Sequence, residues 1–190
     1  MASSSSNSVH LLIMWITPFS RGVLPVSVGV QSSASRYSVV AASIYHHFPS
    51  KADLSAAVVR RYWEDIAADL ESILAGTSDP LRCLHQYPGI FCKSLVNDHR
   101  MCLCSFMAAE YDNLPEAVQK EVQIFAEINV AWLSKVLSAA AVVSTAESKP
   151  RASAIFAAVA GAQLMARRRS DISLFDSLIG SYRVAALLPA

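Results

Sequence analysis

Apolar residues recur with a helical period over most of this chain. Between Ser50 and Gly76 they stand three or four positions apart, at Leu54, Val58, Tyr62, Ile66, Leu70 and Ile73. This spacing places side chains on one face of an α-helix. Ser50 followed by Asp53 is typical of a helix start, and Gly76 of a helix end. The pattern predicts one long amphipathic helix that must bury its apolar face against other helices.

The helical period continues toward the C-terminus, and no strand pattern or internal repeat follows residue 43. A second helix is expected from Pro80 toward Val96, with a break at Pro88. We expect residues 138–149 to form a connection of small and polar residues. The remaining expected helices are a buried one at 101–111, one from Pro115 to about Val136, and two over about 150–169 and 171–188. The predicted fold class is all-α.

The composition limits the kind of protein. A chain of 190 residues with 53% hydrophobic and 16% charged residues is one domain, and it is too apolar to be disordered. Four Cys do not make a disulfide scaffold. The longest strongly apolar run, Leu11 to Ile16, is too short to span a bilayer, and no Lys or Arg precedes it as in a secretory signal.

The first 43 residues differ from the rest, with twelve Ser, two Arg and no acid. Residues 1–61 carry five Lys or Arg and one acid, a net charge of +4, whereas residues 62–190 carry eleven and fourteen, a net charge of −3. A positively charged N-terminal region is typical of a surface that contacts nucleic acid. In a chain with so few charges, the same asymmetry also arises by chance.

Residues 43–54 read SIYHHFPSKADL. Tyr45 and His47 can donate hydrogen bonds to phosphate oxygens, and Lys51 adds positive charge at a helix N-terminus. His46 points about 100° away from His47 on a helix. From the residues alone, a cluster that only fills a helix junction is the alternative.

This string resembles the hinge of the TetR family of bacterial transcriptional repressors, where the recognition helix leads into a long connecting helix. Residues 101–110 (MCLCSFMAAE) and 113–116 (NLPE) resemble a core segment of one subgroup, so the resemblance covers about residues 42–188. It implies a cytoplasmic, non-enzymatic, homodimeric repressor with a helix-turn-helix-like head on a helical ligand-binding bundle. No cofactor is implied. Operator DNA would contact Tyr45, His46, His47 and Lys51.

The sequence departs from the family before the hinge. The family's turn glycine would fall near Ser38 and a basic residue near Ala41, and neither is present. Pro18 and Pro25 stand where the first helix should be. The expected organisation is an irregular segment at 1–42, a remnant of the recognition helix and hinge at 43–53, and a helical domain at 54–188. Weak DNA binding follows, and the rival interpretation is an effector-binding or thiol-sensing protein that no longer binds DNA.

A small-molecule site is expected inside the helical domain, because aromatic rings, soft sulfurs and a few polar groups commonly line such cavities. The candidate residues are Phe91, Cys102, Cys104, Phe106, Glu110, Phe125, Asn129 and Trp132. A solid core is the alternative. Cys102 and Cys104 would diverge by about 200° on a helix, so no shared metal is expected. They are inert core residues or reactive thiols.

Two identical subunits are expected to pair through the helices at about 150–169 and 171–188. Small residues at Ala157, Ala158, Gly161 and Ala162 would let helices approach closely, and Phe175 is a candidate contact. The alternative is that these helices pack only within one subunit.

Overall fold

The computed structural model describes residues 48–96 and 102–189, and this part of the chain is helical without strands. The all-α class is therefore confirmed. Tyr45, His46, His47 and the segment 1–42 lie outside the described residues. The elements are α3 (Lys51–Gly76), α4 (Pro80–Val96), α5 (Leu103–Ala108), the 3₁₀ turn η2 (Tyr111–Asn113), α6 (Glu116–Ala139), α7 (Thr145–Arg169) and α8 (Ile172–Val184).

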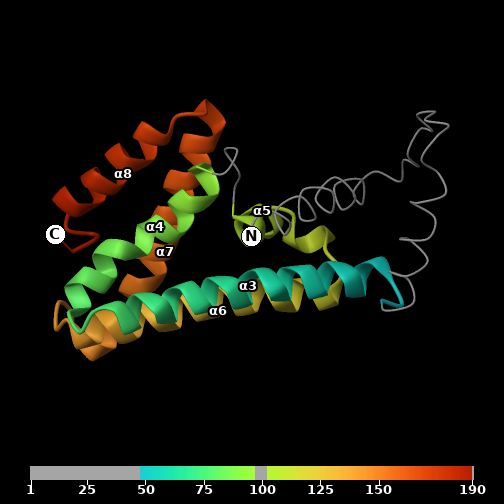
Figure 1. Cartoon of the computed structure of the whole chain (residues 1–190), viewed down its shortest axis with the longest axis horizontal. Helices are drawn as coiled ribbons and strands as arrows, with labels where there is room; N and C mark the ends of the chain where they lie inside the picture. The colour runs from blue at the N-terminus through green and yellow to red at the C-terminus, as the bar shows by residue number, and fades with distance from the viewer. Residues whose placement is uncertain (1–47, 97–101, 190) are drawn as a thin grey trace.

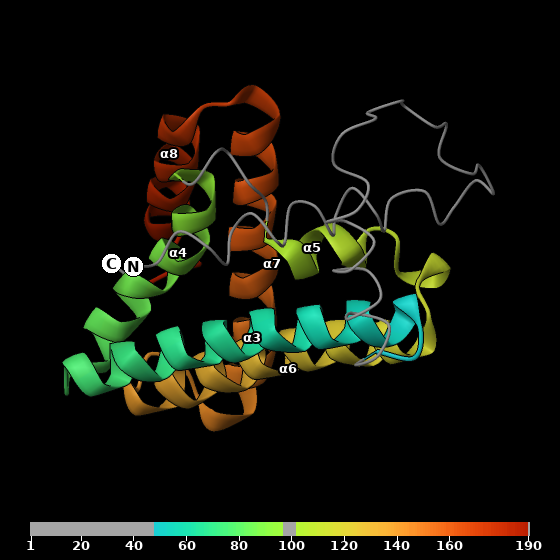
Figure 2. The same cartoon turned by 45° about the vertical axis from the view of Figure 1, so that its right-hand side comes forward.

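The long helices α3 and α6 lie side by side along the body (Figures 1 and 2). The helix α3 begins and ends where the sequence predicts: the Ser50 hydroxyl accepts a hydrogen bond from the Asp53 amide at 3.2 Å, and the helix ends at Gly76. Figure 1 shows α7 rising from the end of α6, α4 beside α7, and α8 turning back along α7. The core therefore lies among α3, α4, α6 and α7.

Two predicted boundaries are wrong, and proline is the cause in both. The helix α4 continues through Pro88, whose ring is buried, so packing of the ring against the core offsets the missing hydrogen bond. The helix α7 begins at Thr145, five residues before Pro150, because Ser144 and Glu147 form a capping box. The connection from α6 to α7 is thus shorter than the expected 138–149.

The helix α5 is also shorter than expected. It covers six residues rather than all of 101–111, and the 3₁₀ turn η2 follows it. Leu103, Cys104 and Met107 are buried, as an apolar segment should be. None of the described helices is long and apolar enough to cross a membrane.

Candidate functional site

Six aromatic rings form a continuous run through the core. Their centroids are 5.7 to 6.2 Å apart from each ring to the next. Tilted and offset rings at these separations interact favourably. The order is Trp132, Tyr87, Phe91, Phe156, Phe125 and Tyr62. The run crosses α3, α4, α6 and α7, so a molecule inserted among these rings would contact four helices at once.

Asn129 is the polar group inside this aromatic run, and it is fully buried. Its side-chain oxygen accepts a hydrogen bond from the Tyr87 hydroxyl at 3.0 Å, and its amide nitrogen donates to the Phe125 carbonyl at 2.9 Å. Burial raises the pKa of Tyr87 well above its ordinary value, so this hydroxyl stays a neutral donor. The Trp132 indole donates to the Leu70 carbonyl at 3.1 Å. The run thus carries polar groups of defined orientation.

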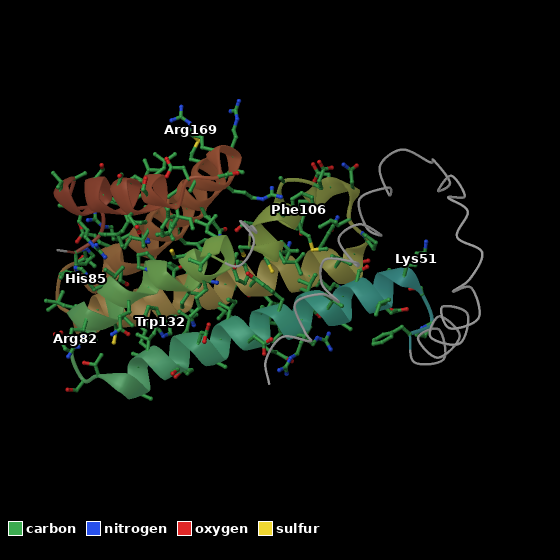
Figure 3. The ribbon with its side chains drawn as sticks, turned by 45° about the horizontal axis from the view of Figure 1, so that its top comes forward. Lys51, Arg82, His85, Phe106, Trp132 and Arg169 are labelled. Carbon is green, nitrogen blue, oxygen red and sulfur yellow. The ribbon has the colours of Figure 1, made fainter. Side chains whose placement is uncertain are left out.

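The structure brings together part of the predicted ligand set. Phe91, Phe125, Asn129 and Trp132 share the aromatic core, where Trp132 of α6 stacks on Tyr87 of α4 (Figure 3). Phe106 on α5 is half-buried and packs against the core. Glu110 is exposed and accepts a hydrogen bond from the Asn113 side chain at 3.1 Å, so it lies apart from the other residues.

Cys102 and Cys104 do not lie on one helix, so the helical argument that they diverge does not apply to them. Cys102 is not helical: it is the N-cap of α5, with φ −52° and ψ 124°, and only Cys104 lies inside the helix. The Cys102 backbone amide donates a hydrogen bond to the Gln163 side-chain oxygen at 3.0 Å. Both thiols are buried and free. Both cysteines belong to the same buried core as the aromatic run.

Gln163 is a buried polar residue that the sequence patterns did not single out. Its amide nitrogen donates to the Phe91 carbonyl at 2.8 Å, and its oxygen accepts from the Cys102 backbone amide at 3.0 Å. It therefore ties α4 and the start of α5 to α7. The sequence offered one signal for it: Gln163 is a polar residue on the apolar stripe that Val159, Ala162 and Ala166 form along the helix.

A second group that the sequence did not indicate joins α3 to α6. Glu121 is buried, accepts from the Trp63 indole at 2.8 Å and pairs with Arg60. Burial raises the pKa of Glu121, but the hydrogen bonds from Arg60 and Trp63 and the charge of Arg60 lower it below its ordinary value. An open groove of about 510 Å³ lies beside this pair, lined also by Phe48 and Lys120.

Replacing Glu121 by Gln removes the charge that pairs with Arg60, so the free energy of unfolding should fall by about 1–2 kcal/mol at pH 7. The loss stays modest because Arg60 can return to water once the charge is gone. The folded pKa of Glu121 is depressed, so its contribution exists above the unfolded pKa and disappears as pH falls through the folded one. Urea unfolding from pH 7 into acid should show the two proteins converge. Asp65→Asn, which breaks the exposed pair with Arg61, should change stability by less than about 0.5 kcal/mol.

Within residues 48–96 and 102–189, no three His, Cys, Asp or Glu side chains gather as metal ligands would. His85 is exposed on α4 (Figure 3). His99 lies outside the described residues.

No model of a known protein family and no curated protein matches the chain. Solved structures do match. A TetR transcriptional regulator from Legionella pneumophila is 27% identical over 80% of this chain and 82% of its own, with a TM-score of 0.70. A TetR-family transcriptional regulator from Agrobacterium tumefaciens is 30% identical over 91% and 93%, with a TM-score of 0.69. The reduced form of Escherichia coli NemR shares the fold at 21% identity over 91% and 93%, with a TM-score of 0.66.

The helical body, with its first long helix leading out of the hinge, is thus the fold of TetR-type transcriptional regulators. The identity to the Agrobacterium protein, over nearly all of both chains, shows that this chain belongs to the TetR family. The Legionella and Agrobacterium proteins are named as regulators, which points away from an enzymatic activity.

Proposed function

We propose that this protein is an effector-responsive transcriptional regulator of the TetR type, with impaired DNA binding. The observation that carries the proposal is the course of α3. This helix begins at Lys51, next to the hinge motif, and runs 26 residues into the body, where it adjoins the aromatic core. Figure 3 shows Lys51 at the hinge end of α3. A change in the core can therefore move the hinge through one rigid element.

The effector site would be the aromatic core around Asn129. Apolar rings with a few oriented polar groups suit a small, largely apolar molecule that carries one hydrogen-bonding group. Tyr62 and the Leu70 carbonyl belong to α3, whereas their partners Phe125 and Trp132 belong to α6. A molecule that binds one spacing of these two helices better than the other would shift the equilibrium between them.

A homodimer through α7 and α8 would convert this motion into a change in the separation of two heads. Outward positions on α7 carry Ala157, Gly161, Leu164 and Met165, and Val184 on α8 is 91% exposed. A Cβ added at Gly161 or Gly180 would meet no atom within 4 Å, so no contact within one subunit requires glycine there. A second copy in close approach would require it.

We expect weak binding of duplex DNA, because the sequence before Tyr45 lacks the turn glycine and the pattern of the first amphipathic helix. Fluorescence anisotropy with duplexes selected from a random pool should give a dissociation constant above about 1 μM at physiological salt, and affinity should fall steeply with salt. Replacing residues 1–42 by those of a DNA-binding family member should recover tight binding. A nanomolar, sequence-specific footprint by the unaltered chain would contradict impaired binding.

The rival function is a helical effector-binding protein that has lost DNA binding altogether. This function keeps the effector site and the homodimer. It predicts that no DNA sequence is selected from the random pool, and that replacing residues 1–42 does not restore DNA binding. Lys51→Ala discriminates further. If Lys51 contacts phosphate, the variant should bind all duplexes more weakly and lower the slope of log affinity against log salt by about one.

A further inference from the structure

Gln163 places a carboxamide group against the aromatic run. It is fully buried and follows Phe156, one of the six rings, by seven positions, so the two side chains share a face of α7. The Gln163 amide nitrogen donates to the Phe91 carbonyl at 2.8 Å. The Phe91 ring lies 5.7 Å from the Tyr87 ring and 6.2 Å from the Phe156 ring. The carboxamide therefore meets α4 at a residue whose ring stands in the middle of the run.

Main-chain partners fix the orientation of this carboxamide. A carbonyl group can only accept a hydrogen bond, so the Gln163 nitrogen must face Phe91. A backbone amide can only donate one, so the Gln163 oxygen must face Cys102. A flip of the side chain would lose both hydrogen bonds. Gln163 is thus a preorganised group, and a ligand that binds it pays little to order it.

The same carboxamide has hydrogen-bonding capacity beyond these two contacts. An amide group offers two N–H donors and two oxygen lone pairs. Toward the described residues, Gln163 uses one N–H and one lone pair. One donor and one acceptor of defined orientation are left. A ligand with its own amide group matches them, because it also offers a donor beside an acceptor.

The charges of the core favour an uncharged ligand. Among the described residues, Glu121 is the one buried Asp, Glu, Lys, Arg or His. Arg60 and the Trp63 indole already bind its carboxylate. The polar side chains that adjoin the aromatic run, Asn129 and Gln163, are neutral amides. An ion buried among these rings would find no opposite charge, which is strongly unfavourable.

We propose that the effector is an uncharged aromatic molecule with a carboxamide or lactam group, and that Gln163 reads this group. The inference rests on the proposed function, whose effector site it specifies. The flat body of the molecule lies among the rings, where Trp132 and Tyr87 already stack with 20° between their planes. The amide end exchanges hydrogen bonds with the Gln163 carboxamide.

The helix α5 offers a way into the core. It packs on the core through Leu103, Cys104 and Met107. It has six residues and no side-chain hydrogen bond at its N-cap, where the Gln163 oxygen binds the Cys102 amide instead. Helices this short have little stability of their own, so α5 can open at a lower cost than global unfolding. A small aromatic molecule can enter during such an opening.

The first test titrates the full chain at neutral pH with benzamide, benzoate and benzamidine. These probes have nearly the same shape but are neutral, anionic and cationic. Isothermal titration calorimetry should give benzamide a dissociation constant on the order of 1 mM, as suits so small a ligand. Both ions should bind at least about tenfold more weakly. The proposal is overturned if benzamide does not bind, or if either ion binds as tightly.

The second test asks whether Gln163 reads the amide or only holds the helices together. Gln163→Met keeps the length of the side chain and removes both hydrogen-bonding groups. It should weaken benzamide about tenfold but leave the affinity for toluene, which uses only the rings, within about twofold. Gln123→Met, at an exposed position of α6, is the matched control and should change neither affinity. An equal loss for benzamide and toluene would assign Gln163 a structural role and overturn the reading.

The two tests also separate this inference from the proposed function. The ranking of the three probes uses the unaltered protein, so it stands even if Gln163→Met does not fold. If benzamide binds as expected but replacing residues 1–42 recovers no DNA binding, only the proposed function fails. If that replacement recovers DNA binding and benzamide does not bind, only this inference fails.

Discussion

Asn129→Asp should reduce the free energy of unfolding by about 3–5 kcal/mol at pH 7. The substitution hardly changes the shape of the side chain. It replaces the amide group that donates to the Phe125 carbonyl by a carboxylate oxygen, so two acceptors face each other. The Tyr87 hydroxyl is then the one donor to a fully buried charge. A buried charge without a cationic partner is among the costliest changes a core can receive.

The loss should depend on pH in a defined direction. Burial raises the pKa of a carboxyl group, so the folded variant holds its proton more tightly than the unfolded chain does. The destabilisation should therefore be small below the unfolded value of about 3.9, grow as pH rises, and level off above the folded pKa. In the protonated form, the carboxyl group can again donate to Phe125 and accept from Tyr87.

Urea unfolding of the variant between acid and neutral pH measures this dependence. Asn113→Asp is the matched control, because Asn113 is exposed and the same change there should cost less than about 0.5 kcal/mol. Equal stability of Asn129→Asp and the unaltered protein at pH 7 would show that Asn129 does not hold the buried position described here.

Leu164→Glu should weaken the proposed homodimer about 100-fold or more, with the subunit still folded. Leu164 is 51% exposed on α7, so within one subunit a carboxylate can reach water. Across a two-fold axis the change occurs twice, and each copy buries a charge against an apolar surface. Central contacts of this kind contribute about 2 kcal/mol or more to association.

Sedimentation equilibrium at micromolar concentration measures the dimer, and circular dichroism reports the helices. Val142→Glu is the control, because Val142 is 42% exposed in the connection between α6 and α7 and outside the proposed interface. A mass near 20.5 kDa for the unaltered protein would refute the homodimer. Phe175, a contact expected from the sequence, is 2% exposed inside its own subunit, so Phe175→Glu would test folding rather than assembly.

Local sequence patterns determined where the helices lie. The start of α3 at Ser50, its end at Gly76 and the start of α4 at Pro80 all follow from residues within one turn of each boundary. The apolar period likewise identified Phe125, Asn129 and Trp132 as one stripe. These features could be predicted because caps and periodicity depend on neighbours in sequence.

Only the tertiary structure decided which residues meet. Gln163 bonds with Phe91 and Cys102, which are 72 and 61 positions away, and Glu121 bonds with Trp63 at a separation of 58. Periodicity shows that a face is buried but not what it faces. Cys102 is held as an extended N-cap rather than as part of a helix. That conformation depends partly on Gln163, a contact between residues far apart in sequence that no local pattern encodes.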